Sequence, residues 1–318
     1  MTTACAPGKI ILFGEHAVVY GRPALAVPVQ QVQAQASIEK TGEYSGENWA
    51  DSVLVQAPDI GLFSSLSVLQ AHHPPHPLAA VIEKTLQRLN ISQPPALSVT
   101  IRSTIPVASG LGSGAAVSVA VIRALAGLFG QPLPDAQISQ IAYEIEKLHH
   151  GTPSGIDNTV ITYAKPVYFV RGEPIETLTV ARPFSLLIAD TGIAAPTKES
   201  VADLRKLWQA APAKWEKVFD QVGQIVQSAK KAIESGQTAQ LGPLMDANQS
   251  LLQKMGVSSS ALDRLVLAAK AGGADGAKLS GGGRGGNMIA LAQSQSAEAV
   301  ASALKAAGAK NVIITQVG

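Results

Sequence analysis

The order of hydrophobic and polar residues predicts strands in several short stretches of this chain. A half-buried strand alternates with a period of two, and a fully buried strand is a short apolar run bounded by turn residues. Residues 97–102, Leu-Ser-Val-Thr-Ile-Arg, show the alternating pattern. The predicted strands are residues 9–13, 23–29, 32–39, 97–102, 166–171, 184–190, 287–292 and 312–317.

Apolar residues spaced three and four apart predict helices in the stretches between these strands. Residues 115–129 are apolar on nearly every face, which is typical of a buried helix. Residues 41–76 are polar, with Gly, Asp and Pro scattered through them, so we expect loops and one short element there. The predicted helices are residues 78–89, 115–129, 134–149, 198–209, 213–235, 238–253, 260–271 and 296–307.

The pattern of predicted helices and strands changes between residues 175 and 195. Strands and helices are mixed before this point, whereas long amphipathic helices dominate after it. A chain of 318 residues is also long for one hydrophobic core. We therefore predict two domains, residues 1–178 and 179–318, in an α/β or α+β protein.

Composition and charge narrow the class of protein. Hydrophobic residues make up 46% of the chain and charged residues 15%, which is enough to fill a large core and excludes general disorder. The formal net charge is only +2, which argues against a nucleic-acid partner or a polybasic membrane surface. A local cluster could still bind a small anionic ligand.

The number of cysteines and the length of the apolar runs indicate the cellular compartment in which the protein is expected. Cys5 is the only cysteine, so the chain can form no internal disulfide and no cysteine-based metal site, and we expect this side chain to be buried. The first residues show no cleavable leader, and no apolar run is long enough to span a bilayer. We expect a cytoplasmic protein.

A glycine-rich segment at residues 106–116 is a candidate phosphate site. Glycines allow the backbone to approach a bulky ligand, and the helix expected behind them begins with free N–H groups and a positive dipole end. Ser113 is expected to cap that helix and could also reach a phosphate or a metal ion. The segment matches neither a Walker A loop nor Gly-x-Gly-x-x-Gly. A tight turn without a ligand is the alternative.

Two acidic residues follow in the next part of the chain. Glu146 is expected near the end of a helix, and Asp157 follows a turn containing Pro153 and Gly155. A hydroxyl nucleophile needs a base within hydrogen-bond reach, and Mg²⁺ on a nucleotide needs one or two carboxylates, so two such acids could divide these roles. Purely structural roles, a turn cap and an ion pair, are the alternative.

Two further segments carry candidate chemistry. Lys9 opens a predicted apolar strand, where it either extends toward solvent or neutralises a negative group, and Glu15–His16 follow in a turn bounded by glycines. Glu15 and His16 could bind polar groups of a substrate or be solvated loop residues.

At residues 281–286 a glycine run implies close approach of a ligand or of the neighbouring domain, with a flexible connector as the alternative. His72, His73 and His76 are expected in a solvated loop.

Taken together, these segments resemble the GHMP kinases, and within that superfamily the mevalonate kinase family. The resemblance spans nearly the whole chain. It is specific because all of these segments occur together, whereas a single glycine loop would not identify the family. The matching segments are residues 6–21, 110–113, 153–158, 190–192, 197–199 and 278–281.

The resemblance implies an α+β, two-domain GHMP kinase fold. Its N-terminal half would be like ribosomal protein S5 domain 2, and its C-terminal half would be ferredoxin-like. It implies ATP and Mg²⁺ as cofactors and ATP-dependent phosphorylation of (R)-mevalonate to (R)-5-phosphomevalonate. The residues implied to bind ATP are Pro106, Ala108, Ser109, Gly110, Leu111, Gly112, Ser113, Gly114 and Ala115.

The same resemblance implies the remaining roles. Asp157 matches the catalytic base and Lys9 the lysine paired with it near the substrate hydroxyl. The implied Mg²⁺ ligands are Glu146 and Ser113, and the implied mevalonate-binding residues are Glu15, His16 and Thr197.

The chain departs from the family pattern at two glycine segments. Gly114 stands where the family usually has a second serine, often assigned to Mg²⁺, and Arg284 interrupts the last glycine run, where it could touch a phosphate or point outward. Two alternatives to mevalonate phosphorylation therefore stay open: a related enzyme acting on another small alcohol, a phosphoalcohol or a decarboxylation substrate, and a nucleotide-binding sensor without catalysis. A homodimer is also left open.

Overall fold

The computed structural model describes residues 1–44, 48–106, 109–150 and 153–318. The chain forms two compact units that interleave along the sequence. The first contains residues 1–8, 32–106 and 112–164, and the second contains residues 9–31, 107–111 and 165–318. Strands β1 and β2 contribute residues to both units, so each unit is described by itself. The division at residues 178 and 179 stays a prediction.

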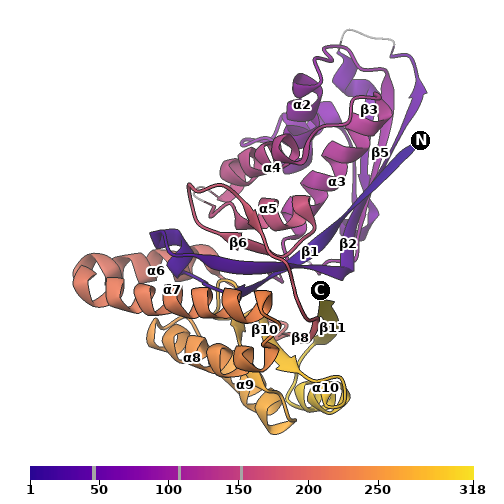
Figure 1. Ribbon diagram of the computed structural model, residues 1–318. Helices are drawn as coiled ribbons and strands as arrows, with labels where there is room; N and C mark the ends of the chain where they lie inside the picture. The colour runs from indigo at the N-terminus through magenta and orange to yellow at the C-terminus, as the bar shows by residue number, and fades with distance from the viewer. Residues whose placement is uncertain (45–47, 107–108, 151–152) are drawn as a thin grey trace. The chain divides into compact units, whose positions relative to one another are not determined.

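The first unit combines a sheet with a group of helices (Figure 1). Along the sheet the order is β4-β3-β5-β2, and the pairs are antiparallel except for β3 with β5. Helices α2, α3, α4 and α5 pack against one another. The bounds are β1 (Thr2–Phe13), β2 (Ala24–Gly42), β3 (Val53–Ala57), β4 (Leu62–Ser65), β5 (Ala96–Ser103), α1 (Leu66–Gln70), α2 (Pro77–Arg88), α3 (Ser113–Leu128), α4 (Asp135–His150) and α5 (Ile156–Tyr163).

The second unit contains an antiparallel sheet of order β11-β8-β10-β9. Helix α8 covers the edge strand β9: side chains of Asp246 and Gln249 accept hydrogen bonds from the amides of Ala277 and Leu279. The bounds are β6 (Val167–Phe169), β7 (Glu176–Thr177), β8 (Phe184–Asp190), β9 (Gly276–Ser280), β10 (Asn287–Ala292), β11 (Asn311–Val317), α6 (Thr197–Ala210), α7 (Pro212–Glu234), α8 (Leu241–Lys254), α9 (Ser260–Ala271) and α10 (Ala297–Ala306).

Most elements agree with the sequence pattern, and the exceptions have local causes. The prediction missed β9, because glycine, alanine and lysine hide its strand character, and it missed α5, whose β-branched Thr159–Thr162 segment is a poor helix former. Residues 53–70 hold two strands and a helix rather than one short element.

Strand β1 is longer than its apolar run. It begins at Thr2 because a strand needs only one buried face, so Lys9 lies inside the strand rather than at its opening. Cys5 is exposed in the outer part of β1, so the prediction of a buried thiol is wrong. Over the residues that the structure describes, none of the helices combines the length and apolar character needed to cross a membrane.

Candidate active site

The first glycine segment leads into helix α3, as predicted. Gly112 occupies the N-cap position with φ of 76°, and Gly110 has φ of 81°, both in the left-handed region that favours glycine. Ser113 is the first helical residue and its side chain makes no cap hydrogen bond, so the prediction that it caps α3 is wrong. The cause is the left-handed Gly112, which takes the cap position itself.

The first turn of α3 has the features of an anion site. The first helical hydrogen bond runs from the amide of Ala116 to the carbonyl oxygen of Gly112 at 2.9 Å. The amides of Ser113, Gly114 and Ala115 precede that bond, at the positive end of the helix dipole. A Cβ atom built on Gly114 would meet nothing within 4 Å, so the place of the family's second serine is open space.

Residues 109–111 of this segment are held by the second unit. The backbone amide of Lys9 donates to the carbonyl oxygen of Leu111 at 3.0 Å. The side-chain amide of Asn287, at the start of β10, donates to the carbonyl oxygen of the buried Ser109. Ala108 lies outside the described residues, and Pro106 belongs to the first unit.

Glu146 and Asp157 lie on packed helices of the first unit. Glu146 is near the end of α4 and Asp157 is in the first turn of α5, and both side chains are half-buried. The side-chain amide of Asn158 donates to the hydroxyl of Ser139 at 2.8 Å and to its carbonyl oxygen at 3.1 Å, which fixes the start of α5 against α4. Since α3, α4 and α5 are in mutual contact, one packed group carries Ser113 and both acids. Lys9 belongs to the other unit, so its meeting with Asp157 stays a prediction.

The turn after β1 is buried, so the reading of Glu15 and His16 as solvated loop residues is wrong. Glu15 is 3% exposed and His16 is 5% exposed. The ammonium group of Lys278 forms an ion pair with the Glu15 carboxylate, and Nε2 of His16 donates to the carbonyl oxygen of Gly282 at 3.1 Å. The hydroxyl of Ser280 donates to the carbonyl oxygen of Ile11 at 2.7 Å. Strand β9 and the loop after it therefore hold this turn at two places and the end of β1 at a third.

Burial also sets the protonation of this turn. It raises the pKa of Glu15, against the opposing charges of Lys278 and Lys9, and it lowers the pKa of Lys278, against the charge of Glu15. Burial lowers the pKa of His16 to about 4, so the imidazole is neutral at pH 7. Its Nε2 carries the proton donated to Gly282, which leaves Nδ1 as an acceptor.

Two polar atoms of the turn remain unsatisfied. Oε2 of Glu15 and Nδ1 of His16 are buried and have no hydrogen-bond partner among the described residues. Buried polar atoms are nearly always hydrogen-bonded, so each unsatisfied atom needs an explanation. A polar ligand carrying hydroxyl groups would supply the missing donors.

The last glycine run is the loop of a hairpin between β9 and β10, packed against the second unit itself. A Cβ atom on Gly282 would lie 2.3 Å from Oγ1 of Thr197, and one on Gly283 would lie 2.0 Å from the carbonyl oxygen of Val257. The expected close approach is present, and the neighbours that the structure shows are segments of this unit's own chain. These contacts exclude a flexible connector and place Thr197, exposed at the start of α6, beside the loop.

Arg284 does not point free into solvent, because its side chain pairs with Asp203. It has φ of 58°, and its guanidinium donates to Oδ2 of Asp203 on α6 at 2.7 Å. Its backbone amide donates to the carbonyl oxygen of Val257 at 2.8 Å. Arg284 thus ties the loop to α6.

The histidines at residues 72–76 carry no metal site in the described part of the chain, where no group of three or more His, Cys, Asp or Glu side chains could hold an ion. Nδ1 of His76 accepts a hydrogen bond from the amide of Leu78 and so caps α2. His72 and His73 are exposed, as expected.

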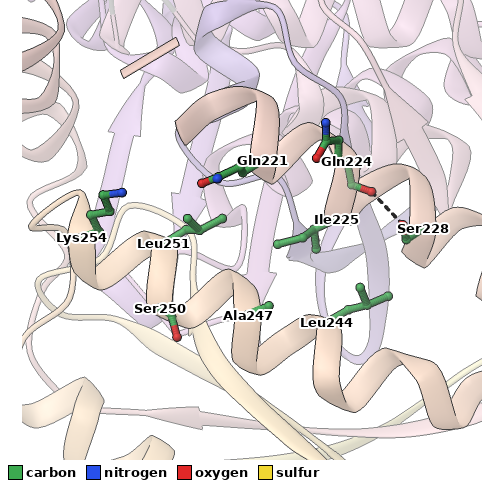
Figure 2. A pocket seen from close by; sticks show the side chains of 9 residues that line it. All are labelled: Gln221, Gln224, Ile225, Ser228, Leu244, Ala247, Ser250, Leu251 and Lys254. Carbon is green, nitrogen blue, oxygen red and sulfur yellow. Dashed lines mark hydrogen bonds between the residues drawn. The ribbon is translucent and has the colours of Figure 1, made fainter. Parts of the chain in front are cut away.

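A groove along α7 and α8 is a separate surface feature (Figure 2). Ile225, Leu244 and Leu251 form its apolar part, with Gln221 and Lys254 among the polar residues that line it. Its lining contains no residue that the sequence singled out.

Sequence reasoning missed two residues that shape the site. The sequence indicates Lys278 only as part of a family-matching segment and Asn287 only as the start of a predicted strand, whereas they hold Glu15 and Ser109 respectively. A usable signal was present for Lys278, because a lysine between Ala277 and Leu279 in an apolar context needs a buried partner.

Comparisons with known proteins agree over the whole chain. Residues 77–165 match the GHMP kinases N terminal domain, and residues 229–310 match the GHMP kinases C terminal domain. The mevalonate kinase of Pyrococcus abyssi is 36% identical, covering 98% of this chain and 95% of that protein. The mevalonate kinase of Thermococcus sibiricus is 35% identical, covering 98% and 94%.

Solved structures give the same match. Mevalonate kinase of L. major in complex with R-mevalonate superposes with a TM-score of 0.83 at 29% identity, covering 100% of this chain and 96% of that one. The mevalonate kinase of Methanococcus jannaschii superposes with a TM-score of 0.82 at 26% identity, covering 99% and 96%.

Proposed function

Since this chain belongs to the mevalonate kinase family of the GHMP kinases, we propose that it transfers the γ-phosphoryl group of ATP to (R)-mevalonate. The products are (R)-5-phosphomevalonate and ADP, in the supply of isoprenoid precursors, and we place the enzyme in the cytoplasm. Family membership also confirms the α+β, two-domain GHMP kinase fold expected from the resemblance. The observation that carries the proposal in the structure is the buried Glu15–His16 turn, in which two polar atoms have no hydrogen-bond partner among the described residues.

The phosphates of ATP are assigned to the first glycine segment. Residues 109–111 bring backbone groups to the ligand, and the first-turn amides of α3 at Ser113, Gly114 and Ala115 donate to phosphate oxygens. Phosphoryl transfer depends mostly on positioning and charge neutralisation, so a rigid backbone cradle suits it.

Residues suited to Mg²⁺ are present in the first unit. Glu146 offers a carboxylate and Ser113 a hydroxyl, and oxygen ligands are what Mg²⁺ prefers. Mg²⁺ is usually bound by one or two carboxylates together with phosphate oxygens and water, so the open space at Gly114 does not exclude it. When bound to ATP, the ion would neutralise phosphate charge.

The proton and charge steps are assigned to Asp157 and Lys9. Asp157, fixed in the first turn of α5, accepts the proton of the C5 hydroxyl of mevalonate as that oxygen attacks phosphorus. Lys9, buried in β1 beside the carbonyl oxygen of Leu111, neutralises negative charge on the transferring group.

Mevalonate itself is assigned to the second unit. With the C5 proton assigned to Asp157, the C3 hydroxyl group of mevalonate can donate to one of the two buried acceptors, Oε2 of Glu15 or Nδ1 of His16. Thr197, packed on Gly282, supplies a further hydroxyl at the start of α6.

The deciding experiment measures ADP formation by the purified chain with Mg²⁺, ATP and a panel of small alcohols and phosphoalcohols. We expect (R)-mevalonate to give the highest kcat/KM. A higher value for another alcohol would make this a related kinase. ATP binding without turnover on any alcohol would indicate the sensor instead.

A further inference from the structure

The contact between Lys278 and Glu15 is a fully buried ion pair inside the second unit. Both side chains have 0% exposure, and Lys278 lies on β9 while Glu15 lies in the turn after β1. The ammonium group also donates to the carbonyl oxygen of Leu279 at 2.7 Å and lies 6.0 Å from the centroid of the Phe13 ring. Lys278 is therefore held from three sides.

An ion pair buried this deeply adds little to the free energy of unfolding by itself. Removing two charges from water costs several kcal/mol for each ion, and hydrophobic residues of similar volume often serve as well. The pair also leaves Oε2 of Glu15 buried without a partner among the described residues, although one Glu15 oxygen already takes the ammonium group. The arrangement thus presents one acceptor atom in a fixed direction.

Resting on the proposed function, we infer that Lys278 is a positioning residue that acts through Glu15. It keeps the Glu15 carboxylate ionised and oriented, so that Oε2 accepts a hydrogen bond from a hydroxyl group of mevalonate. Without Lys278, burial alone would favour the protonated carboxyl group, which presents a donor in place of an acceptor.

The charged groups around this carboxylate are known within the described residues. Lys278 faces Glu15 from β9, and the charge of Lys9 acts on it from β1. His16 follows Glu15 and feels the charge of Arg284 from the glycine loop. A Lys278 variant leaves the last three groups in place, so a difference between its pH profile and that of the wild type reports on Glu15.

The test substitutes Lys278→Met and follows KM for mevalonate and for ATP from pH 6 to pH 9. We expect KM for mevalonate to rise about 10-fold or more at pH 7, since a charge-assisted hydrogen bond is lost, while KM for ATP stays within about 2-fold. The pH at which mevalonate binding is half-maximal should move up by about one unit or more, and KM should recover at high pH as Glu15 ionises. A merely structural role would weaken both substrates at every pH, and that result would overturn the inference.

Two further variants complete the design. In the double variant Lys278→Met/Glu15→Gln both charges are absent, and we expect its KM for mevalonate to be high and independent of pH. Lys270→Met is the matched control, because it breaks a half-exposed lysine pair with Asp246 in the same unit, and it should leave both KM values within about 2-fold. If the double variant kept the pH dependence of the single variant, another group would be titrating and the inference would fail.

A second measurement separates this inference from the proposed function. If the wild type does not phosphorylate mevalonate, the proposed function fails, but the coupling of Lys278 and Glu15 can still be read from unfolding by denaturant. Burial raises the pKa of Glu15 above 4.5 even against the charge of Lys278, and we expect the loss of that charge to raise it further, so Lys278→Met should lose stability relative to the double variant as pH rises from about 5 to 8. A stability difference between the two variants that does not change with pH across that range would overturn the role of Lys278 even if the kinase activity were confirmed.

Discussion

At the scale of single residues, the sequence identifies the candidate side chains but not the long-range contacts that surround them. Asp157 stands in a recognisable segment, Pro-Ser-Gly-Ile-Asp-Asn, and its helix position is set by the neighbouring Asn158. Glu15 and His16 also stand in a recognisable segment, yet their environment comes from Lys278 and Gly282 on distant parts of the chain. The type of each side chain can therefore be read from the local sequence, whereas its protonation state and its orientation depend on residues that are distant in the chain.

The role of Asp157 is tested by Asp157→Asn. Removing a general base costs roughly 10²–10⁴ in rate, so we expect kcat to fall about 100-fold or more while KM for ATP changes little. Asparagine preserves the size of the side chain, and circular dichroism with thermal unfolding checks that the fold is intact. A variant with near wild-type turnover would show that Asp157 is not the base.

The buried neutral His16 makes stability depend on pH. Its pKa is lowered by burial to about 4 from 6.5, so the unfolded chain binds more protons between these values and stability falls as pH drops through this window. One pKa unit corresponds to about 1.4 kcal/mol, so the wild type should lose about 2 kcal/mol between pH 7 and pH 5 relative to His16→Asn. Asparagine suits this variant because it tolerates the positive φ of 62°.

Denaturant unfolding of both proteins at the two pH values measures this difference. Parallel losses in the wild type and in His16→Asn would mean that His16 is protonated in the folded state.

At the scale of elements, the hairpin loop between β9 and β10 organises the second unit. Its residues contact the start of α6 through Thr197, the connection between α8 and α9 through Val257 and the turn after β1 through His16. Arg284 adds the ion pair with Asp203 on α6. The loop is rich in glycine because side chains would fill the space that these neighbours occupy.

The steric part of this claim is tested by comparing Gly283→Ala with Gly281→Ala. Both positions have positive φ, 73° and 83°, so each alanine carries a strain of about 1 kcal/mol. Only at Gly283 would the new Cβ collide, 2.0 Å from the carbonyl oxygen of Val257, whereas at Gly281 it would meet nothing within 4 Å. We expect the loss of unfolding free energy in Gly283→Ala to be at least about twice that in Gly281→Ala. Equal losses would show that backbone strain alone explains the glycines.

At the scale of the whole molecule, the chain builds two compact units that each carry part of the candidate machinery. The first carries Ser113, Glu146 and Asp157 on packed helices, and the second carries Lys9 and the Glu15–His16 turn. Each unit can therefore be tested through the ligand assigned to it. A ligand that binds only the folded state raises the melting temperature in proportion to its concentration and affinity.

Glu146 is tested in this way with ADP and Mg²⁺. For the wild type, we expect ADP alone to raise Tm and Mg²⁺ to add a further increase, because the ion binds the protein and the nucleotide together. Glu146→Gln should keep the increase due to ADP and lose most of the increase due to Mg²⁺. Glu144→Gln is the matched control on the same helix, since Glu144 pairs with Lys84 and should leave both increases unchanged. If Glu146→Gln kept the full Mg²⁺ increment, the ion would bind elsewhere.

Local sequence was enough to identify the family, most of the helices and strands, and the glycines that precede α3. These depend on local order: spacing sets the period of an element, and glycines before a helix set the free amides. The folded chain was needed to identify the partner of Glu15, which lies 263 residues away, the neutral state of His16, and the neighbours that require glycine at Gly282 and Gly283. The physical reason is that burial and close contact depend on which distant segments meet, and a one-dimensional pattern does not record that meeting.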